Sequence, residues 1–533
     1  MKPSRIYLII ILLAVLPYVN AISGDFVYDD TRLITSNENL KDWSNLWRGF
    51  GRDYYASTSD RITLGYYRPV TVGITLVDYH LWGNNPAGYH VTNIAFHAAN
   101  SLLLYRIASF FLPLPFALAA SAIFAVHPVH TETVTFISGR VDAIAAFFYL
   151  TALFLFLRWR KPERPLADWR YGLSLMVFFC GLLSKEMAIT LPLAILALLL
   201  VERVKLRAII TQVAPYFAVI AVYLVIRFAV LGHLAGKVDF SHGTSLLVRA
   251  MTAVKIAAYY LYTLLLPPVG LNMEPPIALV QDVADPYFIL SCAVIAAAVI
   301  GSIVLNRRMP AFSFGLLWFM VSLGPVLNII PIETLAAERF LYIPSAGFAL
   351  ALSAGLGKLV GSGFKPAPAS HSTQVKLNWA HLWPILLLVV ACLPITVHRN
   401  SFWQDDIVLW TEKLKTVPGL PSAYDHMGSY YLRKGEIEKG IDAFRALVKV
   451  APNHARAHYN IGVYLEKKGL YADAAAEYTR AIQSDPTHAG AHYNLGLIYF
   501  REGKVELAYQ EWTETLRFAP GHQGALYWMQ MRR

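Results

Sequence analysis

Long runs of apolar residues fill the first 400 positions of this 533-residue sequence. The apolar core of a bilayer is about 30 Å thick, and a helix needs roughly 20 apolar residues to cross it. Eleven runs approach that length: 6–22, 89–112, 115–127, 139–158, 170–184, 187–202, 209–231, 286–305, 311–330, 340–360 and 380–397. The sequence therefore predicts an all-α, polytopic membrane domain of about 11–12 helices over residues 1–400.

Two apolar segments allow a second interpretation. The run at 6–22 follows Lys2 and Arg5 and resembles a signal peptide, but we favour an uncleaved first helix. Residues 249–268 are apolar enough to span, yet Lys255 and the terminal Pro267 and Pro268 favour a re-entrant or interfacial helix. If 249–268 crossed the membrane, the basic residues that follow it would change sides.

A different periodicity begins at residue 421. Three blocks of 34 residues follow one another, at 421–454, 455–488 and 489–522, which is the length of a tetratricopeptide repeat (TPR). The same residue types recur in register: Gly428, Gly462 and Gly496; Gly435, Gly469 and Gly503; Pro452, Pro486 and Pro520; His454, His488 and His522; and the aromatic residues Phe444, Tyr478 and Trp512. These five columns predict a solenoid of stacked helix pairs.

Residues beside these blocks complete the solenoid. Trp410 lies one period before Phe444, so 401–420 is predicted to form the second helix of an incomplete first repeat. Residues 523–533 are predicted to cap the other end. The TPR domain thus covers 401–533.

Basic residues fix the predicted orientation of the membrane domain. The formal net charge is +11, although only 15% of the residues are charged and 56% are hydrophobic. The cations cluster in short links between apolar runs, as the positive-inside rule describes, so nucleic-acid binding is not expected. The basic links place the N-terminus in the cytoplasm, and an odd number of crossings then places the TPR domain outside. We expect a multi-pass protein of the bacterial inner membrane.

Polar loops and charged residues at membrane ends are candidates for chemistry, because ionisable groups are costly there. The external loop 23–88 is rich in Tyr and Trp and contains a predicted amphipathic helix at 67–82. Within it, the pair Asp29 and Asp30 follows the first span, and a carboxylate there can serve as a general base. A solvated loop or a helix cap would also explain this pair.

Other ionisable residues gather on the same predicted side: Arg68, His90, His127, His130, Glu132, Arg140, Asp142, Lys185, Glu186, Glu338 and Arg339. We expect them to converge on one external cavity that binds phosphate and sugar. For each residue the alternative is structural, such as an ion pair at a turn or hydrogen bonding between helices, as for His90, Asn93 and His97 on one helix face. No HExxH spacing is present, and the three cysteines lie in apolar runs, so no metal is expected.

These motifs resemble a known family. The segments FVYDDTRLITSNENL, YYRPV, HPVHTETVTFISGRVD, SKE and AERFLYIPS, followed by the repeats, are similar in order to the transmembrane-and-TPR protein O-mannosyltransferases. Those enzymes belong to the GT-C glycosyltransferases, which use polyprenyl-phosphate sugars. This chain differs in having only three full repeats.

The resemblance implies a GT-C membrane domain and an extracytoplasmic, periplasmic active site. It implies transfer of mannose from a lipid phosphate to Ser or Thr of a protein, with inversion and without a metal or other cofactor. Asp29 matches the expected base and Asp30 its neighbour, and the other ionisable residues match the family's polar motifs for donor phosphate and sugar. A bacterial carrier would be undecaprenyl phosphate, and the TPR groove is expected to recruit the protein or peptide acceptor.

Two other functions fit parts of the pattern. A non-enzymatic scaffold displaying TPRs needs only one span and leaves the external charged residues unexplained. A polysaccharide polymerase or ligase also combines many spans with TPRs, and the size of its glycan product would distinguish it. The sequence contains no GxxxxGK[ST] phosphate loop, so a directly ATP-driven pump is not favoured.

Overall fold

The computed structural model describes residues 2–58, 63–160, 168–234, 244–267, 271, 275, 277–332, 334–359 and 383–531. It divides into two compact units, Met1–Asp405 and Asp406–Arg533, and each is described by itself. Over these ranges all regular elements are helical. Some residues used to predict the topology lie outside the described residues: Lys161 and Arg164 in the basic link between the runs 139–158 and 170–184, most of the basic stretch 358–376 after the run 340–360, Pro268, and the start of the predicted span 380–397.

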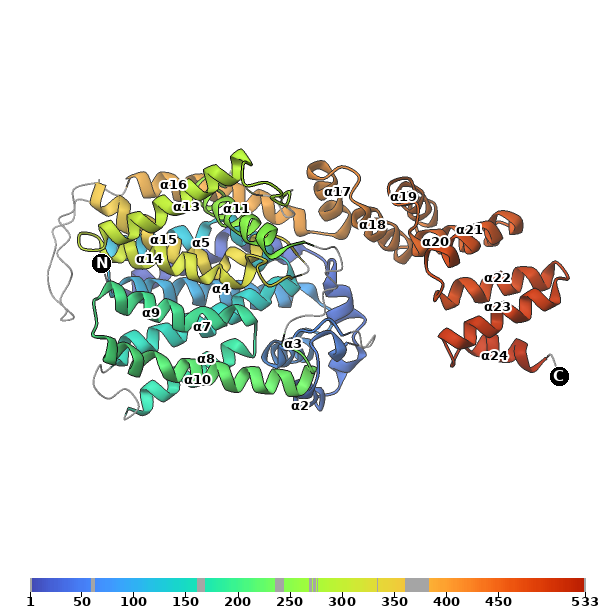
Figure 1. Ribbon diagram of the computed structural model, residues 1–533, viewed down its shortest axis with the longest axis horizontal. Coiled ribbons are helices and arrows are strands. Elements are labelled where there is room, and N and C mark those ends of the chain that lie inside the picture. The colour runs from blue at the N-terminus through green and yellow to red at the C-terminus, as the bar shows by residue number, and fades with distance from the viewer. Residues whose placement is uncertain are drawn as a thin grey trace. The chain divides into compact units, whose positions relative to one another are not determined.

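The first unit is a bundle of apolar helices (Figure 1). Each predicted range overlaps a helix: α1 (Pro3–Val15, continued by the 3₁₀ helix Leu16–Ser23), α4 (Pro86–Ala108), α5 (Leu114–Val126), α7 (Arg140–Trp159), α8 (Trp169–Leu182), α9 (Leu191–Val201), α10 (Leu206–Leu231), α13 (Pro286–Leu305), α14 (Pro310–Ser322), α15 (Tyr342–Leu359) and α16 (Trp383–Asn400). The ambiguous segment forms α11 (Leu246–Leu265), which packs against α13.

Not every helix is long and apolar enough to cross a membrane alone. In the described ranges six helices meet that requirement, or seven if the pair Leu114–Val126 and Pro128–Thr135, bent by 45°, is one span. Trp169–Leu182, Glu186–Val201 and Pro310–Val326 are apolar but shorter. The chain is thus a multi-pass membrane protein, and its short helices end where polar segments enter the bundle.

Two glycines allow α14 and α15 to pack closely. A Cβ atom on Gly315 would lie 2.6 Å from the carbonyl oxygen of Gly347, and one on Gly347 would lie 2.7 Å from the carbonyl oxygen of Gly315. Small residues at such crossings let membrane helices gain dispersion energy from close backbone approach. Glu338 and Arg339 lie just before the first residue of α15. The close packing of α14 and α15 therefore fixes the position of these two charged residues at one side of the candidate site.

The second unit confirms the TPR prediction. Its helices are α17 (Asp406–Thr416), α18 (Pro421–Arg433), α19 (Ile437–Val450), α20 (Ala455–Lys467), α21 (Tyr471–Ser484), α22 (Ala489–Arg501), α23 (Val505–Phe518) and α24 (Gln523–Gln530). Trp410 of α17 is buried and stacks on His426 of α18, at 4.3 Å between ring centres.

The repeated columns have direct structural causes. A Cβ atom on Gly462 would lie 2.7 Å from the ring of Tyr478, so the first helix of the repeat needs glycine where the aromatic ring of the second helix lies. Gly469 has a φ of +78°, which favours glycine at the turn between the two helices. His488 caps α22, because its ring nitrogen accepts a hydrogen bond from the Ala491 amide at 3.1 Å.

Candidate functional site

The acidic pair lies in a tight turn after the first span. Tyr28 has a φ of +52°, an unusual left-handed conformation for a bulky residue, and Asp29 and Asp30 follow it on a helical turn. The Asp29 carboxylate is partly exposed and accepts a hydrogen bond from the Tyr55 hydroxyl at 3.1 Å. Asp30 points inward and is fully buried. The two carboxylates therefore have different environments.

Asp30 holds the acidic turn against the segment that precedes α7. Its carboxylate accepts hydrogen bonds from the Val27 amide at 3.1 Å, from the Ser138 amide at 2.8 Å and from the Ser138 hydroxyl. Burial raises the pKa of Asp30 to about 7, and these hydrogen bonds oppose the shift without cancelling it. Asp30 is thus placed to position Asp29 and not to meet an acceptor.

A broken stretch between α5 and α7 supplies several charged groups. The short helix α6 (Thr131–Thr135) carries Glu132, and α7 begins with Arg140 and Asp142. A break inside a membrane protein frees backbone carbonyls that need donors. The Asn93 amide on α4 donates to the carbonyls of Val134, Phe136 and Ile137 at 3.2–3.3 Å. The polar face of α4 therefore stabilises the break that brings these charges into the bundle.

Three ion pairs join the predicted cations to carboxylates. Lys185 Nζ lies 2.6 Å from Asp142 Oδ2, Arg68 Nη2 lies 2.6 Å from Glu186 Oε1, and Arg339 pairs with Glu132. The charge of Asp142 also interacts with Arg339 and Arg68, so the pairs form one network. The Phe340 ring lies beside both Lys185 and Arg339, with centroid distances of 5.4 and 5.2 Å.

Access to these cations differs. The exposed fraction of the side chain is 28% for Arg339, 10% for Arg68, 5% for Lys185 and 2% for Arg140. Arg140 is occupied by a buried pair with Asp78 and by a bond to the Tyr89 carbonyl at 3.1 Å. Arg339 and Arg68 are thus the best placed to meet an anionic ligand.

Aromatic residues of the external loop link Asp29 to Arg68. The Arg68 guanidinium lies 4.5 Å from the centre of the Tyr66 ring and 5.7 Å from that of Tyr54. Asp53 fixes this loop, because its carboxylate accepts hydrogen bonds from the backbone amides of Gly65 and Tyr66 at 2.6 and 2.8 Å. Asp29 and Arg68 are therefore both held by one folded loop.

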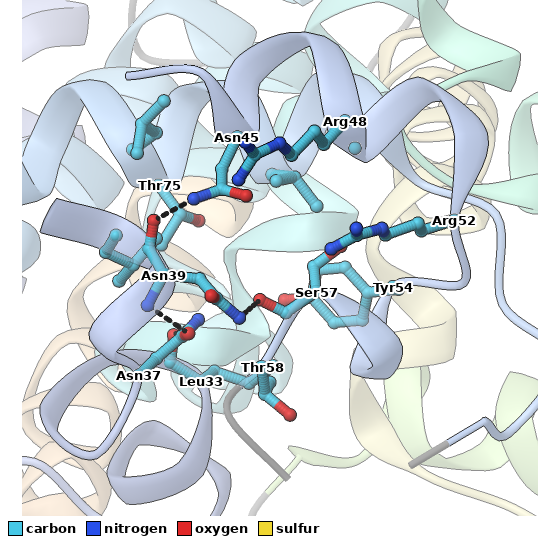
Figure 2. A pocket seen from close by; sticks show the side chains of 14 residues that line it. Leu33, Asn37, Asn39, Asn45, Arg48, Arg52, Tyr54, Ser57, Thr58 and Thr75 are labelled. Carbon is cyan, nitrogen blue, oxygen red and sulfur yellow. Dashed lines mark hydrogen bonds between the residues drawn. The ribbon is translucent and has the colours of Figure 1, made fainter. Parts of the chain in front are cut away.

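The same loop encloses a pocket lined by polar and apolar side chains, among them Tyr54 (Figure 2). Its asparagine amides bind within the loop: Asn45 donates to the Asn39 carbonyl at 2.7 Å, and Asn39 donates to the Ser57 carbonyl at 3.1 Å. These side chains hold the loop in shape, which stabilises Tyr54 and Tyr55 beside the acidic turn.

The predicted histidines lie deeper in the bundle. His130 Nε2 is 2.8 Å from the Ser345 hydroxyl, and His127 Nε2 is 3.1 Å from the Leu264 carbonyl. His90 is buried against the acidic turn, where a Cβ atom on Gly24 would lie 3.2 Å from its Nε2. All three histidines lie against residues of neighbouring segments, so we assign them a structural role. Within the ranges given above, no three His, Cys, Asp or Glu side chains are grouped as a metal site.

Several residues of this site were not identified from the sequence. Asp78 pairs with Arg140 from α3 (Pro69–Trp82), the predicted amphipathic helix, and Arg399 pairs with Glu338 at 2.6 Å from the end of α16. Both are charged residues in otherwise apolar helices, which is a signal that the sequence contains. Tyr54 and Tyr55 carry no such signal, because the loop is rich in tyrosine.

Comparison with known proteins shows what this chain is similar to. Residues 74–233 match the sequence model of the dolichyl-phosphate-mannose-protein mannosyltransferases, and residues 427–489 and 465–522 match that of the tetratricopeptide repeat. A protein O-mannosyl-transferase of Caenorhabditis elegans is 29% identical over 437 residues, which is 80% of this chain and 59% of that protein. The resemblance to the protein O-mannosyl-transferases is confirmed.

A second relative matches the same share of this chain. Human protein O-mannosyl-transferase TMTC3 is 24% identical over 80% of this chain and 49% of its own length. This chain therefore spans about three fifths and about half of the length of these two relatives. An oligosaccharyltransferase structure from Archaeoglobus fulgidus covers 80% of this chain and 59% of that chain, with 14% identity and a TM-score of 0.43. The match at 74–233 includes Glu132, Arg140, Asp142, Lys185 and Glu186.

Proposed function

We propose that this protein is a GT-C glycosyltransferase that moves a sugar from a polyprenyl-phosphate donor to hydroxyl groups of a protein acceptor. Mannose is the proposed sugar, in line with the names of the relatives. The observation that carries the proposal is that Asp29, a partly exposed carboxylate, is linked through the rings of Tyr55 and Tyr66 to Arg68, one cation of the network of ion pairs. Such a site offers a base for the acceptor and positive charge for the leaving group.

Asp29 is the proposed general base. Its carboxylate takes the proton of a Ser or Thr hydroxyl as that oxygen forms a bond to the anomeric carbon of the sugar. The bond from this carbon to the phosphate oxygen breaks, and its electron pair leaves with the lipid phosphate. One displacement of this kind inverts the anomeric centre. The bond from Tyr55 keeps the carboxylate oriented toward the acceptor.

Arg339 and Arg68 are proposed to bind the donor phosphate. Negative charge grows on that phosphate as the sugar leaves, and guanidinium groups match its oxygens with two parallel hydrogen bonds. Their partners Glu132 and Glu186 hold them in position before the donor binds. Lys185 and Asp142 form the less exposed part of the same network and are proposed to face the sugar. No metal is required in this scheme.

The orientation is part of the proposal. Basic links between the apolar helices favour a cytoplasmic N-terminus. The acidic turn, the external loop and the TPR unit then lie outside the cytoplasm, in the periplasm if the host is a bacterium, where undecaprenyl phosphate would be the carrier. The TPR groove is proposed to bind an extended segment of the acceptor protein.

Transfer in a purified system tests the proposal. The protein in detergent is incubated with radiolabelled polyprenyl-phosphate mannose and a pool of Ser/Thr-rich peptides. We expect labelled peptide from the wild type, a loss of about 10²–10⁴-fold for Asp29→Asn, and wild-type transfer for Asp25→Asn, an exposed acid four positions away. EDTA should leave the rate unchanged.

Three other outcomes of this experiment would contradict the proposed function or the proposed base. Equal transfer by wild type and Asp29→Asn would reject Asp29 as the base. Absence of transfer with every sugar donor would favour the scaffold function. Label in a long polysaccharide in place of peptide would favour a polymerase or ligase.

A further inference from the structure

A cavity of about 150 Å³ lies between the α4–α5 link, the start of α14 and the end of α15. The C-terminal end of α4 and the N-terminal end of α1 are neighbours, because Arg106 donates a hydrogen bond to the Tyr7 hydroxyl at 2.7 Å. The cavity therefore lies at the end of the bundle where the chain begins. Figure 1 shows α2 and α3 of the external loop at the other end.

Three cations from two distant segments converge on this cavity. Arg307 and Arg308 come from the α13–α14 link, and Lys358 comes from the last turn of α15. All three are exposed, and none forms an ion pair with an acid in the part of the chain that the structure describes. α14 begins here with Pro310 and has no side-chain cap, so the positive end of its dipole adds to the field.

Apolar side chains form the rest of the lining. Phe111, Leu112, Phe312 and Ala354 contribute to the walls, and Leu112 and Ala354 are buried. Cations that only set membrane topology need no shared cavity. A cavity with cations at its rim and apolar side chains on its walls fits an amphiphilic ligand. The anionic head of this ligand would lie among the cations at the membrane interface, and its acyl chains would lie along the helices.

We propose that this cavity binds the phosphate headgroup of an anionic phospholipid in the leaflet next to the N-terminus. Basic pockets between membrane helices on the cytoplasmic side recognise such headgroups. Charge complementarity selects an anionic lipid over a zwitterionic one, and the apolar walls favour a lipid over free phosphate. The inference does not depend on the transferase activity, since it concerns the opposite end of the unit.

Native mass spectrometry of the full chain tests this site. The protein is equilibrated with phosphatidylglycerol and phosphatidylethanolamine in equal amounts, and the lipids retained after detergent removal are counted. We expect the wild type to retain phosphatidylglycerol preferentially. Each cation near an anionic headgroup contributes a factor of about five, so Arg307→Gln/Lys358→Gln should weaken retention about 30-fold.

A matched variant controls for general loss of charge. Lys205→Gln/Arg207→Gln removes two cations at the start of α10, on the same predicted side but outside the cavity, and should retain phosphatidylglycerol as the wild type does. Equal retention of the two lipids by the wild type, or equal loss in both double variants, would overturn the proposal.

A second measurement uses only the wild type, in case the variant does not fold. Hydrogen exchange of the 306–312 link is compared between nanodiscs of phosphatidylglycerol and of phosphatidylcholine, and with inorganic phosphate added to the latter. Slower exchange in phosphatidylglycerol alone is expected. Equal protection by inorganic phosphate would show a site for soluble anions and reject the lipid, and unchanged exchange in all three would reject the site.

Discussion

The Tyr55 hydroxyl donates a hydrogen bond to Asp29 Oδ2 at 3.1 Å, which joins the external loop to the acidic turn. Burial raises the pKa of Tyr55 well above its usual value, and the charge of Asp29 raises it further. The phenol therefore stays protonated and remains a donor at any physiological pH. This bond orients the carboxylate that we propose as the base.

Replacing Tyr55 tests that relationship. Tyr55→Phe removes a hydrogen bond that favours the ionised form of Asp29, so the carboxylate should become more basic and less well oriented. We expect transfer to fall about tenfold, since a bond to a charged group contributes about 1.5–3 kcal/mol, and the acidic limb of the pH–rate profile to move to higher pH. Tyr79→Phe, on α3, is the control. An unchanged acidic limb would show that Tyr55 does not act on the base.

Asp30 should make stability depend on pH. Its pKa rises from 3.8 in the unfolded chain to about 7 in the folded protein, so the neutral form stabilises the fold. That contribution is complete below pH 4 and is lost as pH rises to 7, because the unfolded state then binds fewer protons than the folded state. One pKa unit corresponds to about 1.4 kcal/mol, so the loss is up to ~4 kcal/mol.

The Asp30→Asn variant isolates this effect. The amide resembles the neutral acid and cannot ionise, so the variant should melt at or above the wild-type temperature at pH 8 and equal it near pH 4. Thermal unfolding in detergent at both values measures the difference. A variant that is less stable than the wild type by the same amount at both pH values would contradict the raised pKa.

The buried pair of Asp78 and Arg140 should contribute strongly to stability. Asp78→Asn leaves the Arg140 guanidinium without its counter-charge where only 2% of the side chain is exposed, which typically costs about 3–5 kcal/mol. The melting temperature of the membrane unit should fall accordingly. Lys41→Ala, which breaks an exposed pair with Glu38, should change it little. Similar small effects of both variants would mean that water reaches Arg140.

The TPR unit should not tolerate a side chain at Gly462. In Gly462→Ala the new methyl group would lie 2.7 Å from the Tyr478 ring, a distance that forces the two helices apart. Overpacking of this kind costs about 1–3 kcal/mol, and the melting transition of the TPR unit should shift down. Gly521→Ala places a methyl group in open space and should melt as the wild type does, so equal behaviour of the two variants would contradict the packing.

Local pattern was enough to determine the helices and the solenoid. Apolar runs located the membrane helices because burial in a bilayer requires long apolar segments, and the 34-residue period located the repeats because each helix pair packs only on its neighbours. The same charges that sequence analysis selected, such as Lys185 and Asp142, do meet in space. Charged residues are costly in an apolar bundle, so their presence signals pairing before the partner is known.

Only the tertiary structure decided which charge meets which. Glu338 and Arg339 are adjacent in sequence, yet Glu338 pairs with Arg399 and Arg339 pairs with Glu132. Asp29 and Asp30 are also adjacent, and one is partly exposed while the other is buried, because they occupy successive positions of a helical turn, whose side chains point about 100° apart. Partner choice depends on the packing of helices far apart in the chain, and no local pattern in the sequence encodes that packing.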